Sequence, residues 1–294
     1  MPRMHEDQVD VGVDDVRRLL AHQMPHWAEL PIVPVAEAGT DHALYRLGED
    51  LVARLPVIAG SAGQAAREAA WLPPLARLLP VQVSVPVALG EPDGRYPFAW
   101  SVNPWLPGTP VDPSTVDAAP LAVDLAGFLR ALQAVDTAGA GLFGSRGHPL
   151  SEPTRDRLTR ASLAAAGDVV DAERALAVWE DAQAAPAWPG PPTWFHGDLN
   201  AGNLLTREGR LSAVLDWGPW GAGDPAVDLH AAYQLFDEAS REQFRCEVGA
   251  DHATWVRARG WAVSVAAMEI PYYRETRPEF AARSIAAIDA VLAE

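Results

Sequence analysis

The hydrophobic pattern of this chain changes character after residue 108. Before that point, short apolar runs are broken by turn-forming residues, which is typical of a strand meander. These runs cover residues 32–36, 43–47 and 51–55. After that point, helical periodicity dominates and is interrupted by Gly and Pro clusters. The helical segments cover residues 120–135, 151–166, 169–184 and 228–292. This pattern favours an α+β fold in which a small β-rich part precedes a larger helical part.

The first part also contains a predicted helix over residues 62–79, which Pro73 and Pro74 should bend or end. Two further strands are expected at 85–89 and 96–102. The sequence Asn-Pro-Trp-Leu-Pro-Gly that follows is typical of a stiff, irregular connector. We therefore predict an N-terminal lobe over residues 1–102, a hinge connector over 103–108 and a C-terminal lobe over 109–294.

Charge and composition exclude several classes of protein. The 294 residues include 39 Asp and Glu and 23 Lys and Arg, which gives a formal charge of -16. This acidic balance argues against a nucleic-acid or anionic-membrane partner. The N-terminus lacks an apolar signal core, and no apolar stretch is long enough to span a membrane, so we expect a cytoplasmic protein. Cys246 is the single cysteine, which excludes an intrachain disulfide and a thiolate metal cluster.

All 23 basic residues are arginine. The absence of lysine excludes a Walker-type phosphate loop, and any chemistry that usually uses lysine must use another residue here. Residues 139–144 match the spacing G-x-G-x-x-G, but they follow a helical pattern instead of a strand. A dinucleotide site needs a preceding strand, so we interpret this segment as a loop.

The informative constellation runs from His196 to Asp228. Asp198 and Asn203 lie five residues apart on one loop, and Asp216 follows thirteen residues later at the end of a short apolar run. Carboxylate and amide oxygens brought together in this way suit Mg²⁺ carried by a nucleotide. A further carboxylate, free of metal, would orient an attacking hydroxyl, which is the division of labour that phosphoryl transfer requires.

At these residues the sequence resembles the aminoglycoside phosphotransferase family, the small-molecule relatives of protein kinases. The kinase catalytic loop H-x-D-x-x-x-x-N is present here in the family's H-G-D-x-x-x-x-N form, and Asp216 follows at the kinase spacing. The resemblance extends from about Glu37 to Tyr273. It implies a protein-kinase-like bilobal fold and a nucleotide-dependent kinase that acts on a small-molecule hydroxyl.

The resemblance also implies roles for individual residues. Asp198 would be the catalytic aspartate, and His196 would support its loop by hydrogen bonding. Asn203 and Asp216 would bind Mg²⁺, while Asp228 would anchor the catalytic loop from behind.

In the N-terminal lobe, Arg54 stands at the position where kinases have a phosphate-binding lysine. The acidic partner of Arg54, on the predicted helix, would be Glu68. Arginine can fork two phosphate oxygens, so this departure from the kinase pattern is chemically tolerable. Backbone N–H groups around Gly39 and Thr40 would cover the phosphates of ATP or GTP. The nucleobase would contact the main chain of Ser101, Val102 and Asn103, and the sequence leaves ATP and GTP as alternatives.

The family's acceptor site points to the C-terminal helices. Its expected residues here are Glu269, Tyr272, Tyr273, Trp255 and Trp261. Such a site could take an aminoglycoside, a macrolide or a nucleoside-type compound. Two alternatives stay open at this point: a kinase of an ordinary cell metabolite, and a non-catalytic nucleotide-binding regulator of the same fold. The presence of Asp198 together with both predicted metal ligands argues against the regulator.

Overall fold

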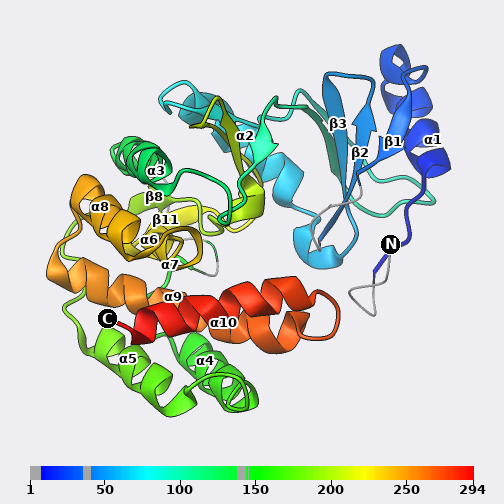
Figure 1. Cartoon of the computed structure of the whole chain (residues 1–294). Coiled ribbons are helices and arrows are strands. Elements are labelled where there is room, and N and C mark those ends of the chain that lie inside the picture. The colour runs from blue at the N-terminus through cyan, green and yellow to red at the C-terminus, as the bar shows by residue number, and fades with distance from the viewer. Residues whose placement is uncertain (1–7, 36–40, 138–143, 145) are drawn as a thin grey trace. The chain divides into compact units, whose positions relative to one another are not determined.

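The computed structural model describes residues 8–35, 41–137, 144 and 146–294 (Figure 1). Gly39 and Thr40, predicted to cover the nucleotide phosphates, lie outside the described residues. The chain forms two compact units. Unit 1 comprises Met1–Arg77, Gln82–Gly108 and Ala213–Gly218, and unit 2 comprises Leu78–Val81, Thr109–Ser212 and Pro219–Glu294.

Unit 1 is built on an antiparallel five-stranded sheet. Its order is β1-β2-β3-β6-β5, from the strands β1 (Ile32–Pro34), β2 (His42–Leu47), β3 (Leu51–Pro56), β6 (Trp100–Pro104) and β5 (Ala88–Gly90). The register pairs Leu44 with Arg54 and Arg54 with Ser101, so Arg54 lies on an interior strand. The predicted meander at 32–36, 43–47 and 51–55 agrees with β1, β2 and β3 within two residues at each end.

The core of unit 1 forms between this sheet and α1 (Val13–Gln23), a helix that the hydrophobic pattern had not predicted. Val16, Leu19 and Leu20 of α1 are completely buried in it. Trp100 of β6 is also fully buried, and the absence of a side chain at Gly90 is what gives its indole room, because a Cβ there would lie 2.0 Å from the ring.

Helix α2 (Gln64–Ala76) carries Glu68, and two residues separate its start from a short 3₁₀ turn at Ala59–Ser61. Pro73 and Pro74, predicted to bend or end this helix, do not end it, and the helix continues to Ala76. Each proline lacks an N–H group, so only the last turn of the helix loses hydrogen bonds. Unit 1 also contains a parallel pairing of β4 (Gln82–Val83) with Ala213 and Val214, the last two residues of β10 (Arg210–Val214).

Unit 2 is mainly helical and is organised around α9 (His252–Tyr273). This helix packs against α4 (Pro153–Ala165), α5 (Ala172–Ala184), α6 (Ala226–Leu229) and α10 (Pro278–Leu292). Figure 1 shows α10 running alongside α9. A helix with neighbours on several faces must be apolar around most of its circumference, and the middle of α9 is buried from Gly260 to Ala267. Helix α3 (Ala118–Gln133) packs on α8 (Glu238–Val248), and the short α7 (Ala232–Leu235) packs against α10.

Two short strand pairs in unit 2 frame the predicted catalytic loop. β8 (Thr193–Phe195) leads into it and pairs with β11 (Gly221–Gly223), while β9 (Leu204–Arg207) leads out of it and pairs with β7 (Thr109–Pro110). The loop between β8 and β9 therefore has both ends fixed by antiparallel strands. Among the described residues, no helix is long and apolar enough to cross a membrane.

Candidate active site

The catalytic loop of unit 2 turns sharply at Gly197. This residue has φ +87°, in the left-handed region, and a Cβ there would lie 2.7 Å from the carbonyl oxygen of Pro219. Both facts require glycine at this position. The glycine of the H-G-D motif thus lets the chain turn between the buried His196 and the partly exposed Asp198.

Asp228 holds the base of this turn. Its carboxylate is fully buried and accepts two hydrogen bonds of 2.7 Å, from the main-chain N–H of His196 and from that of Gly197. Burial raises the pKa of Asp228, while His196 and the two N–H donors act in the opposite direction. The predicted anchoring role of Asp228 has a direct structural basis in these two bonds.

Asp198 is oriented by two amide side chains of the same loop. Asn203 Nδ2 donates to Asp198 Oδ2 at 3.0 Å and to the Asp198 carbonyl oxygen at 2.9 Å. Asn200 Nδ2 contributes a longer bond of 3.3 Å to Oδ2. The main-chain N–H of Asp198 donates to His196 Nδ1 at 3.2 Å, so the imidazole ring makes a hydrogen bond within the loop. The carboxylate is partly exposed and held in one orientation, which suits a group that must receive a proton from a bound hydroxyl.

The donor chemistry of the predicted metal ligands fits Mg²⁺. Asn203 donates from Nδ2 to Asp198, so its side-chain oxygen Oδ1 is not used in those bonds. No described residue donates a hydrogen bond to Oδ1. Asp216 supplies a carboxylate from unit 1. No cluster of three or more His, Cys, Asp or Glu side chains arranged for a metal exists among the described residues. Mg²⁺ typically needs only one or two protein ligands when substrate phosphates supply the others.

Arg54 and its partners form a second polar group, in unit 1. Arg54 Nη1 lies 2.8 Å from Glu68 Oε2, and Nη2 lies 3.1 Å from Asp216 Oδ1. Arg54 is 11% exposed and Glu68 only 1% exposed. The predicted pairing of Arg54 with Glu68 is therefore present, and the same guanidinium also reaches the predicted metal ligand.

The electrostatics of this group follow from burial and proximity. Burial raises the pKa of Glu68, and the positive charge of Arg54 opposes this shift. Burial acts to lower the pKa of Arg54, but Glu68 and Asp216 outweigh it and the pKa is raised. Arg54 thus stays charged, and both carboxylates are paired with it.

Two further members of this group, Gln64 and His42, were not predicted from the sequence. Gln64 donates from Nε2 to Glu68 and to Asp216. His42, at the start of β2, is nearly buried, and burial together with the charge of Arg54 lowers its pKa to about 4. His42 is therefore neutral at neutral pH. Gln64 could have been noticed because it precedes Glu68 by four residues on a predicted helix, which places both on one face.

The predicted nucleobase contacts lie on β6. Ser101 Oγ donates to Asn103 Oδ1 at 2.7 Å, and Asn103 Nδ2 donates to the carbonyl oxygen of Ser84 at 2.8 Å, so both buried side chains serve the structure. Val102 is completely buried and has strands on both sides. In the described part of the chain, β5 is paired along β6 only as far as Val102, which leaves Asn103 with a strand neighbour on the β3 side alone.

The residues predicted to bind the acceptor divide into two groups. Trp255 and Trp261 are 4% and 1% exposed and pack inside unit 2, where Trp261 stacks beneath the guanidinium of Arg155 at 4.4 Å. These two rings have a packing role, and no open surface is left on them for an acceptor. Tyr272 is 43% exposed and meets the ring of Tyr273 edge-on at 4.7 Å.

Glu269 is the charged member of the predicted acceptor group. Its Oε2 accepts hydrogen bonds from Ser284 at 2.6 Å and from Gln234 at 3.3 Å, while no described residue donates to Oε1. Burial raises the pKa of Glu269, and the negative charge of Asp198 raises it further. Glu269 therefore lies within electrostatic range of Asp198, the predicted catalytic aspartate, in the same unit. Ser284 and Gln234 were not predicted, because no motif marks them.

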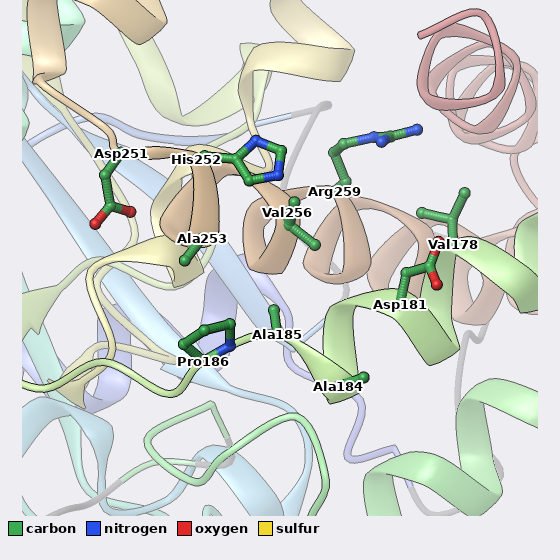
Figure 2. A pocket seen from close by; sticks show the side chains of 10 residues that line it. All are labelled: Val178, Asp181, Ala184, Ala185, Pro186, Asp251, His252, Ala253, Val256 and Arg259. Carbon is green, nitrogen blue, oxygen red and sulfur yellow. The ribbon is translucent and has the colours of Figure 1, made fainter.

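A separate hollow of about 690 Å³ lies at the end of α5 and the start of α9, as Figure 2 shows. Its polar residues include Asp251, which caps α9 by accepting from the N–H of Thr254 at 2.7 Å, and Arg259, which donates to the carbonyl oxygen of Val291 at 3.0 Å. None of the predicted site residues lines it. This hollow is thus distinct from the catalytic loop.

Comparison with known proteins gives one family and one fold. The model of the phosphotransferase enzyme family matches residues 32–261. No curated protein sequence matches the chain.

Solved structures match along nearly the whole chain. The GDP and kanamycin complex of APH(2")-IIia has a TM-score of 0.73 at 17% identity, with 95% of this chain and 98% of that chain covered. The macrolide 2'-phosphotransferase MphH from Brachybacterium faecium has a TM-score of 0.60 at 24% identity, with coverages of 94% and 97%. ADP-bound aminoglycoside phosphotransferase APH(2'')-Ib has a TM-score of 0.59 at 15% identity, with coverages of 96% and 99%. The predicted protein-kinase-like α+β fold is confirmed.

Proposed function

Because the chain belongs to the phosphotransferase enzyme family, we propose that it transfers the γ-phosphoryl group of ATP or GTP, with Mg²⁺, to a hydroxyl of an amine-bearing small molecule. The observation that carries this proposal is the orientation of Asp198 by Asn203 and Asn200 in a loop fastened by Asp228. A module that only bound nucleotides would not need a carboxylate held in this way.

Each group then has a chemical task. The Asp198 carboxylate receives the proton of the acceptor hydroxyl, whose oxygen forms the new bond to the γ-phosphorus. The bond from that phosphorus to the β–γ bridging oxygen breaks, and ADP or GDP leaves with the electron pair. Asn203 and Asp216 would hold Mg²⁺, which neutralises charge on the phosphates when it is bound. Arg54, held by Glu68, would contact the phosphates.

The acceptor class follows from Glu269. It is a partly buried carboxylate with one oxygen that receives no hydrogen bond from a described residue, and it is near enough to Asp198 to influence it electrostatically. An ammonium group on the acceptor would satisfy that oxygen and would lie close to the hydroxyl that reacts. Aminoglycosides and amino-sugar macrolides both carry hydroxyls beside amines, and we propose antibiotics of these two kinds as acceptors, with a role in resistance.

The test is nucleotide turnover with a panel of acceptors. ATP and GTP are each offered with kanamycin, gentamicin, erythromycin and neutral sugars, in the presence and absence of Mg²⁺. We expect Mg²⁺-dependent turnover with at least one amine-bearing acceptor. Asp198→Asn should lower kcat by about two orders of magnitude or more while nucleotide Kd stays unchanged, because only the proton acceptor is removed. Unchanged kcat in this variant would contradict the role of Asp198.

A further inference from the structure

Gln64 is the first residue of α2, one helical turn before Glu68, and its side chain is almost completely buried. Its Nε2 donates to Glu68 Oε1 at 2.7 Å and to Asp216 Oδ1 at 3.2 Å. One primary amide has two N–H hydrogens on the same nitrogen, so a single group can satisfy both bonds. Gln64 therefore links two carboxylates that lie far apart in the sequence.

The contacts of Gln64 complete a closed ring of four side chains. Arg54 bridges the same two carboxylates from the other side, through Nη1 to Glu68 Oε2 and through Nη2 to Asp216 Oδ1. Glu68 thus receives one donor on each oxygen, and Asp216 Oδ1 receives two. Removal of either donor would take away one of the two bonds that Asp216 Oδ1 accepts within this ring.

The position of the Gln64 amide is itself constrained by Gly218. A Cβ at residue 218 would lie 3.0 Å from Gln64 Oε1 and 3.1 Å from Nε2. The carboxamide thus packs directly on the main chain two residues after Asp216. Asp216 has φ +53°, in the left-handed region that aspartate adopts more readily than most non-glycine residues. In this conformation its carboxylate accepts the bonds from Arg54 and Gln64.

Charge explains why an amide is suitable here. In this ring two carboxyl groups share one guanidinium, so acidic groups outnumber basic ones. A neutral donor reduces the repulsion between the carboxylates without cancelling the negative charge that attracts a divalent cation. A second cation at this position would cancel it, and a third carboxylate would increase the repulsion.

On these grounds we propose that Gln64 is a positioning residue that holds the Asp216 carboxylate in the orientation needed to bind Mg²⁺ with the nucleotide. The inference rests on the proposed function, because it assumes that Asp216 is a metal ligand. Gln64 itself need not touch the nucleotide or the metal. Its contribution is to fix the direction of Asp216 Oδ1 before Mg²⁺ arrives.

The experiment measures nucleotide binding instead of turnover. Kd values for ADP and for GDP are determined by calorimetry, with Mg²⁺ and with EDTA, for the parent protein and for Gln64→Met. Methionine has nearly the shape of glutamine but lacks the donor. We expect the Kd measured with Mg²⁺ to rise about tenfold, the scale of one hydrogen bond to a charged group, and the Kd in EDTA to change by less than about twofold.

Two further variants separate positioning from folding. Gln23→Met removes the same side chain elsewhere in unit 1, where Gln23 bonds to the main chain of Glu91, and it should leave both Kd values unchanged. Gly218→Ala keeps the Gln64 donor but displaces its carboxamide, because the new Cβ would lie 3.0 Å from Gln64 Oε1. It should raise the Kd measured with Mg²⁺, as Gln64→Met does. This second variant tests the positioning role even if Gln64→Met folds poorly.

The outcomes are distinct. If Gln64→Met raises the Kd in EDTA as much as the Kd with Mg²⁺, Gln64 acts through Arg54 or through general folding. That result would overturn the positioning role but not the proposed function. Unchanged Mg²⁺-supported binding in Gln64→Met and Gly218→Ala would overturn it as well. A parent protein that binds neither nucleotide would instead overturn the proposed function, and the inference with it.

Discussion

Replacing Arg54 by methionine should destabilise unit 1 in a way that depends on pH. The change keeps most of the side-chain volume but removes the guanidinium that pairs with both Glu68 and Asp216. Asp216 is 39% exposed and can be solvated, whereas Glu68 is 1% exposed and cannot. The cost of the change therefore falls mainly on Glu68, which keeps its bond from Gln64 and has no other side-chain donor among the described residues.

The size of the effect follows from two limits. Leaving one partner of a buried ion pair uncompensated costs about 3–5 kcal/mol. Glu68 can avoid that penalty by taking up a proton, which costs about 1.4 kcal/mol for each pH unit above its ordinary pKa of 4.5. The penalty is therefore capped at about 3 kcal/mol near pH 7 and at about 1 kcal/mol near pH 5.

The direction of the pH dependence is determined by the pKa of Glu68. Burial raises this pKa in the parent protein, and Arg54 opposes the shift, so loss of Arg54 raises the pKa further. A carboxyl group whose pKa is raised by folding stabilises the folded state below its ordinary pKa and loses that contribution as the pH rises through the raised value. The deficit of Arg54→Met should thus grow from about pH 4.5 upward.

Hydrogen exchange of the amides in α2 and β3 measures this deficit in unit 1 directly. Opening free energies are compared between the parent protein and Arg54→Met at about pH 5 and about pH 7, with exchange rates corrected for pH. Adding Glu68→Gln to Arg54→Met removes the uncompensated charge and should recover most of the loss. A deficit that is equal at both pH values, or that the second substitution does not reduce, would refute the reasoning.

Two predictions concern unit 2. Asp228→Asn should lower the free energy of unfolding by about 2 kcal/mol and also reduce kcat, because asparagine has one acceptor oxygen for the two N–H donors of His196 and Gly197. Urea unfolding and steady-state kinetics check it, and unaltered kcat would mean that the clamp does not position Asp198. Glu269→Gln should raise KM about tenfold for amine-bearing acceptors and leave KM for neutral acceptors and nucleotide Kd unchanged, since only the charge is lost. An equal rise in KM for both kinds of acceptor would exclude an ionic contact at Glu269.

Local spacing was enough to predict that Asp198 and Asn203 lie on one short loop. The residues between them include a single 3₁₀ turn, and the two side chains are hydrogen-bonded to each other. The strand meander was predictable for a similar reason, since the alternation of apolar runs and turn residues is a property of neighbouring positions.

Longer-range features were not predictable from spacing. Trp255 and Trp261 lie in the same predicted helix as Glu269, but whether an aromatic ring on a helix faces the core or an open surface depends on what packs against it. Here neighbouring helices cover α9, and both rings are buried. The helix α1 was missed because its buried face of Val16, Leu19 and Leu20 is short and alternates with charged residues.

The sequence by itself determined the order of the β-rich and helical parts, the family motif and the identity of the groups that would carry out phosphoryl transfer. Only the tertiary structure decided how those groups are held. Gln64 contacts Asp216 across 152 residues, and Asp228 clamps the His196–Gly197 turn from more than 30 residues away. Hydrogen bonds act over about 3 Å between particular atoms, so such pairs are defined by folding of the chain and leave no periodicity in the sequence.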